Sequence, residues 1–358
     1  VLASITDPDF EGAVAVGYLD GYFVFNQPNS QKVWVTSLLD GSSVDPLDFA
    51  SAEASPDKLV TLIVDHREVW LFGTNSVEVW YNSGSTDFPL ARIQGAYNEI
   101  GCAAAYSVAK LDNGIFWLGS DARGRGIVYR ANGYTGTRVS THAVEWQIQQ
   151  YGDLSDAIGY TYQQDGHAFY VLIFPSANTT WVYDVATQSW HERAGFYNGQ
   201  FTRHRSNCFA TFGNELVVGD YENGNVYALD LDKNDDNGAP QKWLRSWRAL
   251  PTGQNNLTRT AQHSLQLDCE SGVGLNQLDP FDETGVPGDV LLIESGDFLI
   301  TENGNRIEIT YEITPMQNPI VVLRWSDDGG HTWSNEHYSR MGSIGNYQTR
   351  VFWRRLGM

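Results

Sequence analysis

The sharpest short motif in the sequence is Ser-Asp-Asp-Gly-Gly-His-Thr-Trp, at residues 326–333. It fits the Asp-box pattern S-x-D-x-G-x-T-W, whose defined positions are here Ser326, Asp328, Gly330, Thr332 and Trp333. These residue types suit a hairpin turn, because Asp328 can accept hydrogen bonds from loop amides and Gly330 tolerates positive φ. We expect Trp333 to cover the turn and to pack inward. The motif therefore predicts a structural turn.

Asp-boxes recur in sialidases, so a glycoside hydrolase is one alternative function. Most glycoside hydrolases place two carboxyl groups beside the scissile bond. Adjacent acidic residues occur at 235–236, 282–283 and 327–328, but neighbours on a strand or turn point in different directions. The arginine triad and the tyrosine and acid pair of sialidases cannot be placed in this sequence. We predict no catalytic residue and no enzymatic activity.

The residues that commonly bind metals show no ligand spacing. Residues 232–238 resemble part of a calcium loop but lack its later bidentate glutamate. The eight histidines form no H-E-x-x-H pattern. Cys102, Cys208 and Cys269 are far apart and belong to no C-x-x-C pair, so we expect three buried free thiols. The sequence predicts neither a metal nor a cofactor.

The net charge is strongly negative. The formal charge is −20, and residues 1–239 carry 13 Lys and Arg against 29 Asp and Glu. This excess opposes tight binding to nucleic acid or to an anionic membrane surface, and no long apolar run predicts a membrane span. Four arginines nevertheless stand out as contacts to neighbouring protein subunits: Arg123 and Arg125 in a glycine-rich turn, and Arg354 and Arg355 near the end.

The composition predicts an all-β protein. The chain has 35 Gly, 18 Tyr, 16 Phe and 12 Trp but only 18% charged residues, which favours twisted strands and tight turns over helices. Several tryptophans lie in alternating strands, where core packing is more plausible than a sugar-binding surface: Trp34, Trp70, Trp80, Trp117 and Trp181. A carbohydrate-binding adhesin, the other alternative, would need aromatic side chains exposed on loops.

Five segments repeat one hairpin plan of aromatic strand, polar turn and aromatic strand. They lie at residues 21–37, 67–82, 114–130, 168–184 and 215–230. Aligned on Phe25, Phe72, Leu118, Leu172 and Val218, they are separated by 47, 46, 54 and 46 residues. A four-stranded propeller blade takes about 40–50 residues. We therefore expect five propeller blades in residues 1–240.

The remainder of the chain is less regular. We expect residues 241–358 to form a sixth blade, or closing β region, with an insertion at about 270–315. The strand candidates are 263–267, 290–294, 307–313, 321–325 and 350–353. The complete fold expected from the sequence is a six-bladed β-propeller.

The C-terminal residues resemble a known family. Two segments look like the C-terminal signature of the packaged-DNA stabilisation proteins of short-tailed bacteriophages. One is residues 321–337, which contain Val-Val-Leu-Arg-Trp before the Asp-box, and the other is residues 342–357, which contain Gly-Asn-Tyr-Gln-Thr-Arg-Val-Phe-Trp-Arg-Arg-Leu-Gly. Residues 260–274 resemble the strand and loop that precede it in that family.

The resemblance implies a structural virion protein, the tail hub or nozzle. It implies a six-bladed propeller in a homohexameric ring below the portal and adaptor, which continues the DNA channel, retains the packaged DNA and anchors tail spike, fibre or needle proteins. DNA would then be passing cargo until ejection. The protein would be assembled in the host cytoplasm and would end in the tail of the virion.

Overall fold

The computed structural model describes residues 4–53, 55–121, 124–197, 199–233, 235–247, 263–269, 319–342 and 348–356. The chain divides into two compact units, residues 1–231 and residues 232–358. Secondary structure in the described residues is almost entirely antiparallel β. No helix in this part of the chain is long and apolar enough to cross a membrane.

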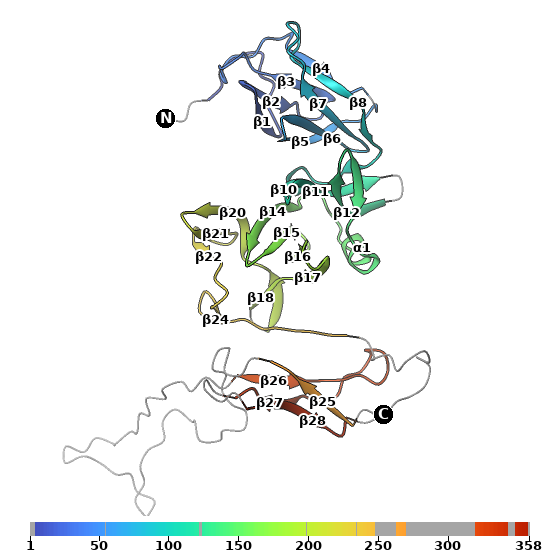
Figure 1. The fold of residues 1–358 in the computed structure, drawn as a ribbon, viewed down its shortest axis with the longest axis vertical. Helices are drawn as coiled ribbons and strands as arrows, with labels where there is room; N and C mark the ends of the chain where they lie inside the picture. Colours follow the sequence, from blue (N-terminus) through green and yellow to red (C-terminus); the bar gives the residue numbers. More distant parts are fainter. Residues whose placement is uncertain are drawn as a thin grey trace, which may run out of the picture. The chain divides into compact units, whose positions relative to one another are not determined.

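The first unit contains a series of antiparallel sheets in which sequential strands pair with one another (Figure 1). The first sheet is β1 (Val16–Leu19), β2 (Tyr22–Asn26), β3 (Lys32–Val35) and β4 (Phe49–Ser51). The second is β5 (Leu59–Asp65), β6 (Glu68–Gly73), β7 (Val77–Asn82) and β8 (Leu90–Asn98).

The third sheet has an additional short strand. It consists of β9 (Gly101–Cys102), β10 (Ala109–Leu111), β11 (Gly114–Asp121), β12 (Gly124–Asn132) and β13 (Thr135–Arg138). A short 3₁₀ helix, η1 (Ala105–Ser107), lies between β9 and β10, and the α-helix α1 (His142–Gln149) follows β13.

The fourth sheet has four strands, and the last sheet of the first unit has three. The fourth is β14 (Ile158–Gln164), β15 (His167–Phe174), β16 (Thr179–Asp184) and β17 (Ser189–Glu192). A separate hairpin, β18 (Ala194–Tyr197) and β19 (Gln200–Arg203), leads to the three-stranded sheet β20 (Ser206–Phe212), β21 (Glu215–Asp220) and β22 (Val226–Ala228).

A common turn joins β1 to β2, β5 to β6, β10 to β11 and β14 to β15 in the first four sheets. Each turn has two central residues with positive φ: Asp20 and Gly21, His66 and Arg67, Asp112 and Asn113, Asp165 and Gly166. Two residues of positive φ define the type I′ turn, whose twist matches that of the strands it joins. The local sequence therefore sets the register of each hairpin.

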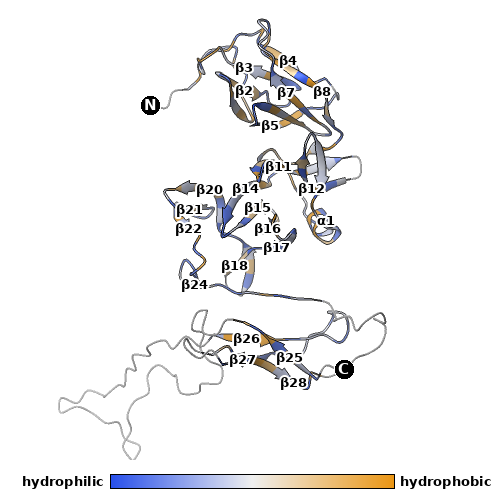
Figure 2. Cartoon of the chain, in the orientation of Figure 1, coloured by the Kyte–Doolittle hydropathy of each residue, from blue (hydrophilic) through white to orange (hydrophobic). Residues whose placement is uncertain are grey.

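Apolar cores fill the spaces between consecutive sheets. One core joins the first two sheets through Val24 and Leu71, and the next joins the second and third through Phe72 and Trp117. Strand β1 passes so close to β5 that a Cβ on Gly17 would lie 2.4 Å from Cγ2 of Val64. Each sheet thus buries its apolar face against its neighbour, as propeller blades do. Figure 2 shows the hydrophobic stretches along these strands.

The five repeats expected from the sequence are the central hairpins of these sheets: β2–β3, β6–β7, β11–β12, β15–β16 and β21–β22. Trp34, Trp70, Trp80 and Trp117 are buried as expected. Trp181 is only partly buried, so the prediction that it packs in the core is only partly correct. The expectation for the thiols holds for Cys102, which is buried, and is wrong for Cys208, which is exposed, and for Cys269, which is half-buried.

The second unit begins with a hairpin of β23 (Asp235–Asp236) and β24 (Ala239–Pro240). Strand β25 (Ser264–Leu267) pairs with β28 (Val351–Arg354), and β26 (Ile320–Leu323) pairs with β27 (His337–Arg340). Three expected strands correspond to β25, β26 and β28, while β27 was not foreseen. The expected strands at 290–294 and 307–313 lie outside the described residues, and the sixth blade stays a prediction.

Candidate functional site

The Asp-box occupies the connection between β26 and β27. Trp325 and Ser334 close its base: the Ser334 amide donates to the Trp325 carbonyl at 2.8 Å, and the Trp325 amide donates to the Ser334 hydroxyl at 3.1 Å. Within the turn, the Gly330 amide donates to the Ser326 hydroxyl at 2.8 Å, and Gly330 has a φ of 97°. The positive φ explains the glycine at this position.

Asp328 organises the turn through both of its carboxylate oxygens. Oδ1 accepts from the Thr332 amide at 2.8 Å and from the Ser326 hydroxyl at 2.7 Å, while Oδ2 accepts from the Thr332 hydroxyl at 2.6 Å. These bonds hold the pKa of Asp328 well below its usual range, and those from Thr332 contribute most to the lowering. The carboxylate is therefore charged and committed to the loop. This geometry supports the structural role, and the absence of chemistry at the turn stays a prediction.

The expectation that Trp333 packs inward is wrong. Its side chain is 49% exposed, and the Arg324 guanidinium lies 5.9 Å from the ring centre. Hydrogen bonds to Asp328 hold the turn, so the structure does not require a buried ring there. Trp353 is the buried tryptophan of this region, and its Nε1 donates to the His337 carbonyl at 3.1 Å. The half-buried Trp325 stacks on His337 with ring centres 4.6 Å apart.

Three of the four arginines proposed as partner contacts are described, and all three are exposed. Arg125 lies on β12, and Arg354 lies on β28 with its guanidinium 5.0 Å from the Phe352 ring centre. Arg355 follows with a φ of 62°, and its amide donates to the His263 carbonyl at 2.8 Å. Arg123 lies outside the described residues. The contacts of these arginines with partners stay predictions.

The adjacent carboxylates are placed on turns. Asp235 accepts from the Gly238 amide at 2.9 Å across the β23–β24 hairpin, and Asp327 is exposed beside the committed Asp328. Neither pair lines either of the two grooves described below. The pair at 282–283 lies outside the described residues. Across the described ranges, no group of three or more His, Cys, Asp or Glu side chains is arranged to hold a metal ion.

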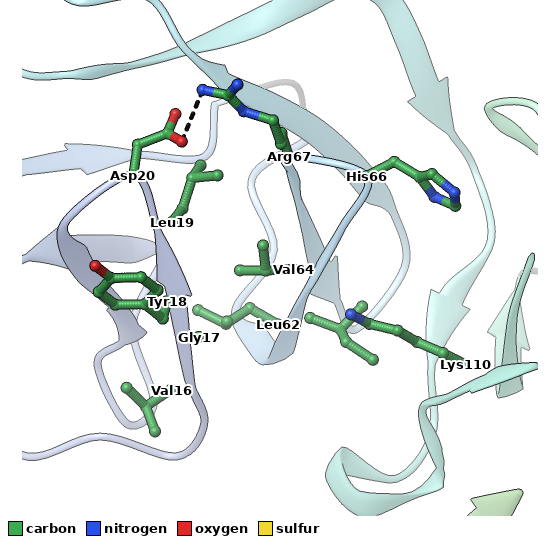
Figure 3. Close-up of a pocket in the computed structure, with 11 residues that line it drawn as sticks. Val16, Gly17, Tyr18, Leu19, Asp20, Leu62, Val64, His66, Arg67 and Lys110 are labelled. Carbon is green, nitrogen blue, oxygen red and sulfur yellow. Dashed lines mark hydrogen bonds and ion pairs between the residues drawn. The ribbon is translucent and has the colours of Figure 1, made fainter. Parts of the chain in front are cut away.

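A groove of about 720 Å³ follows the first strands β1 and β5 and reaches Lys110 on β10 (Figure 3). Arg67 Nη2 donates to Asp20 Oδ1 at 2.8 Å, so an ion pair joins the first turns of two sheets. Lys110 Nζ lies 3.6 Å from an oxygen of Asp65. Because both cations already face carboxylates, the groove lacks the concentrated positive charge that a phosphate backbone requires.

A second groove, of about 650 Å³, lies between α1 and the outer strands β16 and β17. Its walls include the half-buried aromatic residues Tyr151, Trp181 and Trp190. Neither α1 nor this groove was foreseen from the sequence. The sequence does contain two signals of this helix. Thr141 is an N-cap residue that accepts from the Val144 amide at 3.5 Å, and the buried Val144 and Ile148 are spaced by one helical turn.

Comparison with known families identifies the class of protein. Residues 1–234 match the family described as bacteriophage P22 Gp10, β-propeller, and residues 297–358 match the one described as bacteriophage P22 Gp10, β-sandwich. The chain is thus a structural tail protein of a bacteriophage, with a β-propeller fold. It belongs to the packaged-DNA stabilisation protein family of short-tailed phages, which the C-terminal signature had indicated. The family description of the C-terminal part is a sandwich, and the blade count stays a prediction.

No curated protein shows significant sequence similarity to the chain. Among solved structures, the computationally designed Ika8 protein is 16% identical over 62% of this chain and 58% of its own, with a TM-score of 0.36. The dihydro-haem d1 dehydrogenase NirN is 11% identical over 61% of this chain and 44% of its own, with a TM-score of 0.37. Hsv2 of Kluyveromyces lactis is 9% identical over 50% and 59%, at 0.27. The chain therefore spans less than two thirds of each, and scores this low do not establish a shared fold.

Proposed function

We propose that this protein forms the tail hub or nozzle ring of a short-tailed phage. In this proposal six copies continue the DNA channel below the portal and adaptor, retain the packaged DNA and anchor tail spike, fibre or needle proteins. The observation that carries the proposal is the match of both the N-terminal and the C-terminal part of the chain to one phage tail family. The protein would assemble in the host cytoplasm and function in the virion.

Charge supports the role of DNA as passing cargo. The formal charge of −20 per chain would be multiplied in a hexamer, and an acidic or neutral channel does not hold phosphates as a basic one does. Each charge acts over about 8 Å at physiological ionic strength, so the repulsion concerns DNA close to the wall. The ion pairs of Arg67 and Lys110 in the first groove agree with this view.

Exposed apolar side chains on the first and last sheets can contact a β-sheet of a neighbouring subunit. Val16 and Tyr18 on β1 are 64% and 56% exposed, and Phe212 and Val226 on the last sheet are 78% and 67% exposed. Stable interfaces bury about 1,200–2,000 Å² in total, and apolar side chains supply most of the favourable energy. In our proposal, the arginines contact neighbouring subunits or tail proteins.

The test is the state of the purified protein and its behaviour with DNA. Native mass spectrometry and electron microscopy should show a ring of six subunits, and duplex binding should be weak at low and moderate salt. We expect the double variant Arg354→Glu, Arg355→Glu to impair assembly into tails, and Arg350→Glu to serve as a control at another exposed C-terminal arginine.

Two results would contradict the proposal. A protein that stays monomeric at every concentration, also in the presence of portal and adaptor, would rule out the ring. Tight, salt-sensitive DNA binding that is lost in the double variant, while tail assembly remains normal, would show that the arginines grip the genome.

A further inference from the structure

The groove between α1 and β16–β17 takes no part in the ring contacts proposed above. Its volume of about 650 Å³ falls in the range of about 300–1,000 Å³ that is typical of small-ligand sites. Six of its lining residues can contact a ligand through aromatic or polar side chains: Tyr151, Trp181, Trp190, Gln147, Gln188 and Glu192. They come from α1, the segment after it, β16, and the turn and strand β17, all within the first unit.

The aromatic rings in this groove are held in fixed positions. Trp181 Nε1 donates to the Tyr151 hydroxyl at 3.0 Å, and Trp190 Nε1 donates to the Val139 carbonyl at 2.9 Å. Tyr151 and Trp190 also pack on the core aromatics Phe174 and Tyr183, with ring centres 5.0 and 5.2 Å apart. Because the indole N–H groups are engaged inside the protein, these tryptophans offer the groove mainly the surfaces of their rings.

Two glutamine amides and one carboxylate also line the groove. Gln147 projects from α1 and Gln188 from the β16–β17 turn, and both are exposed residues of the groove wall. An amide side chain can both donate and accept hydrogen bonds. Glu192 adds acceptor oxygens. The groove therefore combines rigid aromatic surface with groups that can bind hydroxyls.

The charge of the lining selects among ligands. Among the residues that the structure describes, those lining the groove include no Lys, Arg or His, and Glu192 is the one carboxylate. A phosphate, a nucleic acid or an acidic sugar would meet no countercharge there and would be repelled by Glu192. A neutral sugar has an apolar face of C–H groups, which packs on an aromatic ring, and a rim of hydroxyls. From this combination we infer that the groove is a binding site for neutral oligosaccharides.

The inference concerns the single chain and does not depend on ring assembly. Binding should be measured on the full-length protein by saturation-transfer NMR and isothermal titration. The probes are maltohexaose, chitohexaose and an uncharged, delipidated bacterial O-polysaccharide, with sialyllactose and hexalysine as charged comparisons. At least one neutral probe should bind saturably, whereas sialyllactose and hexalysine should not.

Variants then place the binding in the groove. The double variant Gln147→Ala, Gln188→Ala changes only exposed side chains, so it should keep the native melting temperature and lose about tenfold or more in affinity. Trp146→Ala is the matched control, because Trp146 lies on the same helix, is 62% exposed and does not line the groove. Its affinity should equal that of the native protein.

Three outcomes would overturn the inference. In the first, none of the neutral probes binds to the folded native protein. In the second, the double variant binds them as well as the native protein, which would move the site elsewhere. In the third, only hexalysine binds, which would make the groove a site for cationic segments through Glu192 and the ring faces. A native ring that fails to form while sugar binding persists would refute the proposed function alone.

Discussion

The second sheet and the last described sheet of the first unit share one hairpin plan but differ in how they are covered. Phe72 on β6 is fully buried and meets Trp117 of the third sheet at 5.5 Å between ring centres. Phe209 on β20 stacks on Tyr160 at 6.0 Å, yet Phe212 on the same strand is 78% exposed. The second sheet has a neighbour on each side, whereas the last packs on the fourth sheet through one face. An apolar strand face is a local property, but its burial depends on a neighbour.

Replacing one phenylalanine in each of the two sheets tests this contrast most directly. Phe72→Ala should lower the free energy of unfolding by about 3–5 kcal/mol, because it leaves a cavity between two sheets. Phe212→Ala should change it by no more than about 0.5 kcal/mol in the isolated chain. Chemical denaturation of both variants measures the difference. Equal losses would mean that the last sheet is covered as well as the second one.

The junction between the fourth sheet and the last one should depend on pH. His204 Nδ1 lies 2.7 Å from the Ser206 hydroxyl, which also accepts from the Tyr160 hydroxyl at 2.7 Å. Burial, and then the charges of Arg193 and Arg205, lower the pKa of His204 from 6.5 to about 3. The unfolded chain therefore binds this proton more readily. The stabilising contribution is complete above pH 6.5 and is lost progressively as the pH falls from 6.5 towards 3.

Melting temperatures measured between pH 7 and pH 4 check this expectation. His204→Gln should flatten the fall in melting temperature over that interval, while His263→Gln, at an exposed histidine, should leave it unchanged. The same slope in the native protein and in His204→Gln would show that the half-buried imidazole does not control the junction.

A smaller effect is expected at the Asp-box. Since hydrogen bonds from Thr332 and Ser326 lower the pKa of Asp328 below 3.8, its contribution is present above pH 3.8 and decreases as the pH falls below that value. Asp328→Ala should lower the melting temperature of the second unit at neutral pH and remove this acid dependence. Thermal unfolding followed by the fluorescence of the nearby Trp325 provides the measurement. A variant as stable as the native protein at pH 7 would refute the role of the carboxylate.

The smallest effect should come from the exposed ring of the same turn. Trp333→Ala should change the free energy of unfolding by no more than about 0.5 kcal/mol, since the side chain is half exposed. Trp353→Ala is the comparison, because that ring is buried and its Nε1 is hydrogen-bonded; it should cost about 3–5 kcal/mol. Both values follow from denaturant titrations, and a large loss for Trp333→Ala would restore the inward-packing expectation.

The sequence by itself determined the local elements. The alternation of aromatic and polar residues placed the five central hairpins, and it placed four of the five tryptophans in the core. The Asp-box residues also predicted their own turn, because the bonds that Ser326 and Asp328 accept or donate within it join residues at most four positions apart. Such features depend on the period of the strand and on local hydrogen bonding, both of which can be read within a few residues.

Only the tertiary structure decided which repeated positions are covered. Trp181 and Trp80 both lie on the third strand of a four-stranded sheet, but Trp181 lines a groove beside α1 while Trp80 is buried in the core between the first two sheets. The exposed thiol of Cys208 and the ion pair between Asp20 and Arg67, 47 positions apart, follow from the same stacking of sheets. Burial is set by what lies across the sheet, and the neighbours across a sheet are distant in sequence, so strand period alone could not predict it.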